Sequence, residues 1–140
     1  MSGGDDDDDL ARRVWNVMWD VASSDDRKRA VADALDLSFA RVRALRRLAA
    51  EPRTNRELAR DLITDPPFVT VIVDDLETRG LVRREPHPTD RRAKLIRVTA
   101  AGRRAAEKAD ALLGEPPEAL RALPPEDLAA LDRILAKLLA

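Results

Sequence analysis

The sequence has no cysteine, no tyrosine and a single histidine, His87. Without cysteine, the chain cannot form disulfides, cysteine-ligated metal sites or thiol redox switches. A lone histidine between two prolines is typical of a solvated turn, and the abundant carboxylates fall on polar helix faces, so no pairing of nucleophile and base is expected. We therefore predict no catalytic site, no metal site and no cofactor.

Long hydrophobic runs are missing as well. No apolar stretch approaches the ~18 residues that span a bilayer, and no basic start leads into an apolar signal core. Together with the lack of cysteine, this predicts a soluble, cytoplasmic protein with no membrane partner. The chain has 140 residues, 44% of them apolar, which is enough for one domain with a core, alone or completed by a partner.

An excess of one charge is also absent, because the net charge is only −1, but the charges are unevenly distributed. Residues 1–36 carry a net −5, residues 37–104 a net +7 and residues 105–140 a net −3. A basic centre between acidic ends is where a polyanion such as nucleic acid would dock.

The first nine residues contain two glycines, five consecutive aspartates and almost nothing apolar. Such a segment cannot offset the entropy lost on ordering, so residues 1–9 are predicted to form a disordered acidic tail. Its last aspartates would suit the positive end of a following helix. A DNA-mimicking, autoinhibitory role is the alternative.

Helical spacing of apolar residues begins at Leu10 and returns near the C-terminus. The first helix has an apolar face so wide that it needs more than one packing partner. The C-terminal leucines have the three-four spacing of a seam between helices. Residues 10–36 and 105–140 are therefore predicted to be dimerisation helices. The first helix carries Leu10, Val14, Val17 and Val21 in one stripe and Trp15, Trp19 and Ala22 beside it; the seam is Leu128, Leu131, Leu135 and Leu138.

The centre of the chain carries helix start and stop signals. Ser38 is a predicted N-cap, TNRE (54–57) is a capping box, and Asp65 followed by Pro66 starts a further helix that Gly80 ends. These signals predict a short helix, a turn and a longer helix.

Two extended runs, 81–85 and 94–98, follow around a basic tip with two prolines, as in a β-hairpin. Thr99 then begins another helix. The order predicts a mainly α protein with a small β-hairpin wing: a winged helix-turn-helix over residues 37–104, with N- and C-terminal dimerisation helices.

Over residues 37–102 the sequence resembles the MarR family. The resemblance rests on Leu37 and Ser38 at a helix start, RELARDL (56–62), VTVIVDDLETRGLV (69–82), DRR (90–92) and VTAAG (98–102). It implies a sequence-specific transcriptional regulator, a ligand-responsive repressor that binds a palindromic double-stranded DNA operator as a homodimer. The alternative function is a winged helix that mediates protein–protein interactions without specific DNA binding.

The predicted recognition helix, 66–79, would read the major groove through side chains near its start. Pro67 and Val71 can contact thymine methyl groups and Thr70 a base or phosphate, although Val71 can equally belong to a broad buried face. The family commonly places arginine where this chain has Val71 and Asp75, which keeps the protein-binding alternative open. Asp74 suits the orientation of a nearby arginine better than a bond to a cytosine amine.

Basic residues gather in the predicted wing instead. The resemblance implies that Arg92 enters the minor groove, which attracts arginine most where it is narrow and A/T-rich, and that Asp90 holds Arg92 in place. The alternative is a solvated basic hairpin. The predicted DNA contacts of the wing are Arg83, Arg84, Asp90, Arg91, Arg92 and Lys94.

Trp15 and Trp19 lie one helical turn apart and are two of only four aromatic side chains. The resemblance implies a small aromatic or amphipathic effector between the dimerisation helices and the DNA-binding lobe, and this pair would border that cleft. Packing in the core is the alternative, because large aromatics mostly supply buried area.

Overall fold

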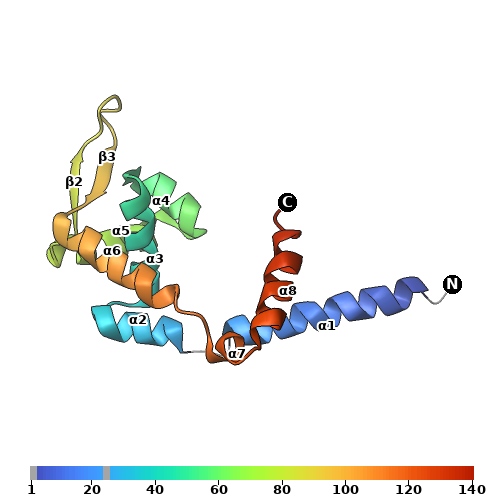
Figure 1. Cartoon of the computed structure of the whole chain (residues 1–140). Helices are drawn as coiled ribbons and strands as arrows, with labels where there is room; N and C mark the ends of the chain where they lie inside the picture. The colour runs from blue at the N-terminus through green and yellow to red at the C-terminus, as the bar shows by residue number, and fades with distance from the viewer. Residues whose placement is uncertain (1–2, 24–25) are drawn as a thin grey trace. The chain divides into compact units, whose positions relative to one another are not determined.

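The computed structural model describes residues 3–23 and 26–140, which fall into two units (Figure 1). The winged unit, residues 26–114, contains α2 (Arg27–Leu35), α3 (Phe39–Ala50), β1 (Arg53–Thr54), α4 (Asn55–Leu62), α5 (Pro66–Thr78), β2 (Val82–Pro86), β3 (Lys94–Val98) and α6 (Ala100–Leu113). The flanking unit, residues 3–23 and 115–140, contains α1 (Gly3–Ser23), α7 (Glu118–Arg121) and α8 (Pro125–Ala136).

Helices α3, α4, α5 and α6 begin at the residues that the sequence predicts. The Thr54 hydroxyl accepts the Glu57 amide at 3.2 Å, and the Glu57 carboxylate accepts the Thr54 amide at 3.1 Å, which completes the capping box. Asp65 caps α5 by accepting the Phe68 amide at 2.7 Å. Ser38 and Thr99 cap α3 and α6 in the same way. Side chains therefore satisfy amides that the first helical turns leave unpaired.

The turn between α4 and α5 depends on a left-handed residue. Ile63 caps α4 with φ 54° and is 91% exposed, an uncommon conformation for a β-branched residue. The Thr64 amide then donates to the Ala59 carbonyl at 3.0 Å, which closes the helix end. This tight turn sets the direction in which α5 leaves α4.

The sheet has three antiparallel strands in the order β1-β3-β2. The hairpin pairs Val82 with Val98 and Pro86 with Lys94, so its strands match the two predicted runs within one residue. The third strand, β1, pairs Arg53 with Ile96 and was not predicted. Two residues are too short to show the period of a strand, so only the fold reveals this pairing.

The core of the winged unit extends beyond residues 37–104. Val31 on α2 is fully buried, and so is Ala109 on α6. Both α2 and α6 therefore contribute to this core. The rest of the buried set comes from α3, α4, α5, α6, the sheet and Leu37, which precedes α3. It comprises Leu37, Val42, Ala44, Leu45, Leu48, Leu58, Ala59, Leu62, Val69, Ile72, Val73, Leu76, Val82, Ile96, Val98 and Ala106.

The expectation of a disordered tail is wrong for residues 3–9, which form the first turns of α1; Met1 and Ser2 lie outside the described residues. Asp5 and Asp6 lie in the first turn, where the positive end of the helix dipole favours acidic groups. Arg12 lies 2.6 Å from Asp8 and 3.6 Å from Asp9, which offsets part of the repulsion within the aspartate run.

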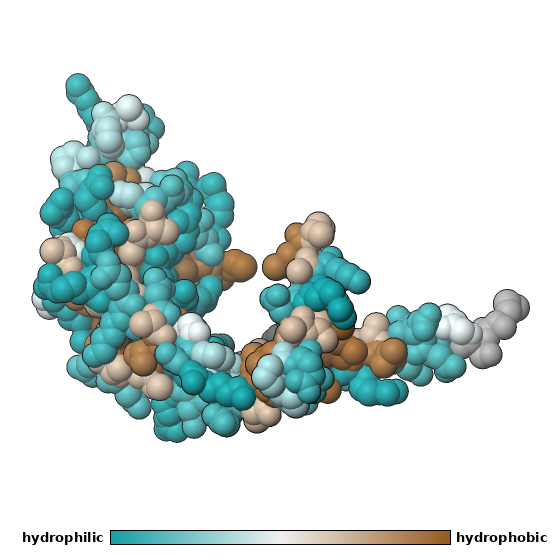
Figure 2. All heavy atoms as spheres, in the orientation of Figure 1, coloured by the Kyte–Doolittle hydropathy of each residue, from teal (hydrophilic) through white to brown (hydrophobic). Residues whose placement is uncertain are grey.

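The flanking unit exposes its apolar side chains. Neither α1, α7 nor α8 contains a buried residue among those described. Val14, Val17 and Leu10 are all at least half exposed, and Figure 2 shows hydrophobic side chains gathered on the surface of this unit. None of the described helices is long and apolar enough to cross a membrane.

Trp15 and Trp19 do not pack in a core of the single chain. Their rings lie 6.1 Å apart at a tilt of 48°, yet the two residues are 60% and 61% exposed. The core-packing alternative is therefore wrong for the chain by itself. The pair remains available to a partner or a ligand.

Candidate nucleic-acid interface

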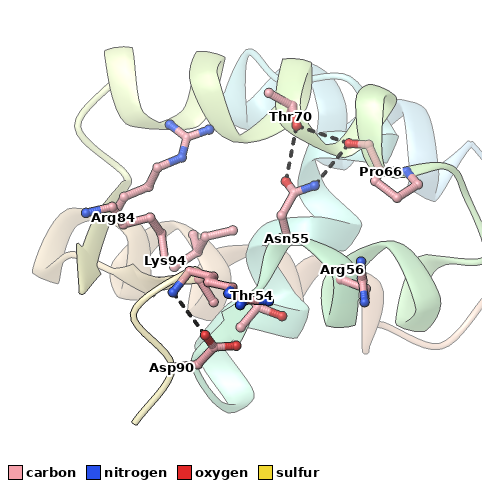
Figure 3. A pocket seen from close by; sticks show the side chains of 11 residues that line it. Thr54, Asn55, Arg56, Pro66, Thr70, Arg84, Asp90 and Lys94 are labelled. Atoms are coloured by element: carbon pink, nitrogen blue, oxygen red, sulfur yellow. Dashed lines mark hydrogen bonds between the residues drawn. The ribbon is translucent and has the colours of Figure 1, made fainter. Parts of the chain in front are cut away.

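An open cleft of about 700 Å³ separates the helix-turn-helix from the wing, which consists of β2, β3 and the connecting residues 87–93 (Figure 3). The N-terminal ends of α4 and α5 form one wall, and the wing forms the other. The lining residues are Thr54, Asn55, Arg56, Pro66, Thr70, Arg84, Asp90, Arg92, Ala93, Lys94 and Ile96.

Asn55, the first residue of α4, joins the starts of the two helices (Figure 3). Its Nδ2 donates to the Pro66 carbonyl at 3.1 Å. The Thr70 hydroxyl approaches the same carbonyl at 3.1 Å and Asn55 Oδ1 at 3.4 Å. Asn55 and its neighbour Arg56 were not among the predicted site residues. The capping box could have indicated them, since it places both in the first turn of α4.

The outward face of α5 is apolar at its start. Val71 is 56% exposed, so the alternative that it belongs to a buried face is wrong. Pro67, Thr70 and Asp74 are exposed as well. The inward face buries Val69, Ile72, Val73 and Leu76. The four residues predicted as groove contacts therefore all lie on the accessible side of α5.

Arg84 lies in the cleft but is held by two carboxylates. Its Nη2 is 2.6 Å from Asp74 Oδ1, and its Nη1 is 2.9 Å from Glu77 Oε1. Glu77 also accepts the Arg84 amide at 3.1 Å. Asp74 therefore orients an arginine, the role that the sequence favoured over a bond to a cytosine amine. Both terminal nitrogens of Arg84 are engaged within the protein.

The tip of the wing is folded by side chain to backbone hydrogen bonds. His87 Nδ1 accepts the amides of Thr89 at 3.2 Å and Asp90 at 3.0 Å, so His87 shapes the turn in addition to meeting solvent. Asp90 Oδ1 accepts the Arg92 amide at 2.9 Å. Asp90 therefore holds the backbone of Arg92 and leaves its guanidinium group free.

Four cations of the cleft and the wing have no carboxylate partner among the described residues. Arg56, Arg92 and Lys94 line the cleft, and Arg91 precedes Arg92 at the tip of the wing. Arg83 differs, because its Nε is 3.4 Å from Glu85. Glu85 also accepts from Arg97 at 2.7 Å, and this hydrogen bond is the main cause that lowers the pKa of Glu85. The described residues contain no group of His, Asp and Glu side chains that could hold a metal ion.

Asp75, at the second position where the family uses arginine, faces the protein. Its carboxylate accepts from Arg41 at 2.7 Å and Arg79 at 2.9 Å. Partial desolvation opposes the charged form, but these two hydrogen bonds outweigh it and lower the pKa of Asp75. Asp75 therefore fastens α5 to α3 and does not reach a groove.

Asp61 anchors α4, and with it one wall of the cleft, through two arginines. Arg53 binds it with two nitrogens at 2.8 and 3.1 Å, and Arg47 Nε lies at 3.0 Å. The hydrogen bond from Arg53 is the main cause that lowers the pKa of Asp61 below its ordinary value of 3.8. This contribution to stability is complete above the unfolded-state pKa and is lost as the pH falls through the lower folded-state pKa.

Asp61→Asn is expected to flatten the acid limb of the stability curve. Denaturant unfolding at a series of pH values from 6 down to about 3 should show a smaller loss of stability in the variant than in the wild type. Asp33 is exposed on α2 and has no ion pair among the described residues, so Asp33→Asn is the matched control and should follow the wild-type curve. Parallel acid limbs for Asp61→Asn and the wild type would contradict this role of Asp61.

The helix order, the capped turn and the antiparallel wing define a winged helix-turn-helix protein. The MarR family model matches residues 35–93. Apo wild-type MarR from E. coli is 28% identical, with a TM-score of 0.75 over 94% of this chain and 96% of MarR. The transcriptional regulator BldR from Sulfolobus solfataricus is 26% identical, with a TM-score of 0.64 over 98% of this chain and 99% of BldR.

A MepR–DNA complex from S. aureus shares the fold at 21% identity, with a TM-score of 0.63 over 92% of this chain and 98% of MepR. The family model over residues 35–93 and the similarity to MarR and BldR along nearly the whole chain point to the same assignment. The chain is a MarR-like winged-helix protein, similar in sequence and fold to these two proteins.

Proposed function

We propose that the chain is a ligand-responsive repressor that binds a palindromic DNA operator as a homodimer. The observation that carries this proposal is the cleft, where two helix N-termini converge with cations that no carboxylate neutralises. Helix N-termini and basic side chains are the groups that hold phosphates and fix a protein's register on a duplex. Arg92, with its backbone held by Asp90, is the proposed minor-groove contact.

The homodimer is supported by the flanking unit. Its helices bury no residue, and α1 exposes two apolar stripes that include Val14, Val17, Trp15 and Trp19. Exposed apolar surface of this kind marks an interface. A two-fold dimer would place its recognition helices on half-sites about 10 base pairs apart, which makes the operator an imperfect palindrome.

The proposed effector is a small aromatic or amphipathic compound recognised near Trp15 and Trp19, whose exposed rings offer flat apolar surface. A ligand can release DNA only through its different affinities for the DNA-competent and incompetent dimers. Screening aromatic acids by tryptophan emission and then by DNA release tests this. Releasing compounds that leave the emission unchanged would exclude the tryptophan pair.

DNA binding itself is tested by anisotropy titrations with labelled fragments that flank the gene, at several salt concentrations. The four cations of the cleft and wing that have no carboxylate partner, eight in a dimer, predict a slope of log affinity against log salt of about −7 if each neutralises one phosphate. Absent or salt-insensitive binding would favour the protein-interaction alternative, which the lack of basic residues on the outer face of α5 motivates.

Arg92→Ala is expected to weaken operator binding and to reduce the salt slope by about two units per dimer, because one phosphate or minor-groove contact is lost in each half-site. The loss should be largest for operators with A/T-rich flanks. Arg104→Ala removes the same charge from an exposed position on α6 outside the cleft and serves as the control. Equal affinities and slopes in both variants would show that the wing does not touch DNA.

A further inference from the structure

The outward face of α5 lacks the side chains that usually read guanine, adenine or cytosine. The stripe opposite its buried residues consists of Pro67, Val71, Asp74 and Thr78, spaced by three and four residues. Bidentate readout of guanine needs arginine or lysine, and bidentate readout of adenine needs asparagine or glutamine. None of these residue types lies on this stripe.

Asp74 on the stripe and Asn55 beside it are already engaged within the protein. Asp74 is paired with Arg84 at 2.6 Å, which removes both an acceptor for cytosine and a donor for guanine. The side-chain amide of Asn55 donates a hydrogen bond to the Pro66 carbonyl at 3.1 Å. The Asp74 carboxylate and the Asn55 amide are therefore held by contacts within the protein.

Apolar groups remain as the accessible feature of the helix start. Val71 is 56% exposed, and Pro67, one helical turn earlier, is exposed too. The thymine 5-methyl group is the apolar feature of an unmodified base in the major groove. Because Val71 and Pro67 stand about 6 Å apart, their contacts would fall on base pairs within about two steps of each other.

We propose that this regulator recognises its operator by burying thymine methyl groups against Val71 and Pro67, at a pair of A·T base pairs in each half-site. This inference rests on the proposed function, because it assumes that α5 enters the major groove of an operator. It identifies the group on the bases that the protein recognises. Phosphate contacts then fix the position of the protein on the duplex, and burial of the methyl groups supplies the sequence specificity.

The test begins with selection of preferred duplexes from a random pool by the full-length protein. Each thymine of the selected half-site is then replaced by deoxyuridine, which removes the methyl group and leaves base pairing intact. Replacement at the contacted thymines should weaken binding by about fourfold per methyl, the value expected for burying one such group. Replacement at other thymines should have no effect.

Val71→Ala connects the effect to the protein. Val71 is exposed, so its truncation leaves the core intact, and the variant should lose most of its response to deoxyuridine at one thymine of each half-site. Ile63→Ala shortens another exposed, β-branched side chain, which lies on the turn before α5, and should keep the full response.

The outcomes separate the two proposals. If selection yields no preferred sequence, the proposed function fails as sequence-specific DNA binding. If a sequence is selected but deoxyuridine is tolerated at every thymine, operator binding stands and methyl readout is wrong. An unchanged deoxyuridine response in Val71→Ala would likewise overturn the assignment to Val71.

Discussion

Gly102→Ala is expected to lower the free energy of unfolding by about 3 kcal/mol, at the upper end of the range for overpacked sites. A Cβ atom on Gly102 would lie 1.9 Å from the carbonyl oxygen of Leu81 and 2.9 Å from its carbonyl carbon. The backbone of Leu81 cannot easily retreat, because its oxygen accepts the Thr99 amide at 3.0 Å. The Thr99 hydroxyl also binds the adjacent Gly80 carbonyl at 2.6 Å.

Chemical denaturation measures this loss, and glycine positions elsewhere supply the control. Gly4 lies inside α1 with no atom within 4 Å of an added Cβ, so Gly4→Ala should be neutral or slightly stabilising because alanine favours a helix. If Gly102→Ala is also neutral, the first turn of α6 does not pack against the backbone of Leu81 as closely as it does in the structure.

The elements that sequence predicted best are those with local chemical signals. Thr54 with Glu57 and Asp65 with Pro66 mark helix starts because the bonds that they make span only three residues. Gly80 marks the end of α5 because its φ of 74° suits glycine. The hairpin followed from two extended runs around prolines. These signals fixed the order of elements, and the match to the MarR family agrees with it.

Pairings between distant residues could not be predicted in this way. Strand β1 exists because Arg53 meets Ile96, 43 positions further along the chain. Arg41 and Asp75 are 34 positions apart, and neither residue carries a local signal that names its partner among the many charged side chains. For the same reason the sequence predicted that Asp74 orients a nearby arginine but did not identify Arg84 as that arginine or Glu77 as its second partner.

The error at the N-terminus has a different physical origin. Composition rules treat five aspartates and two glycines as unable to order, which holds for an isolated segment. Here the segment continues directly into the helix of Leu10 to Val21. That helix has already been nucleated, so each further residue adds a helical hydrogen bond without a new nucleation cost. Pairing of Asp8 with Arg12 acts in the same direction.

Val17→Glu is expected to convert the proposed dimer into monomers at micromolar concentration. Val17 is 56% exposed in the single chain and lies in the middle of the first apolar stripe of α1, so a carboxylate there would be buried without a partner on dimerisation. Light scattering measures the mass directly. On a full operator the variant should bind about a hundredfold more weakly or worse, because two half-sites are no longer held by one linked molecule.

Asn16→Glu introduces the same charge on the polar side of α1 and should remain dimeric, which separates a local clash from a general effect of net charge. The winged unit has its own core, to which α1 contributes no buried residue, so Val17→Glu should leave the folding of the DNA-binding region intact. Affinity for an isolated half-site should then match that of the wild type. A wild-type protein that is itself monomeric at micromolar concentration would overturn the dimer, and with it the palindromic operator.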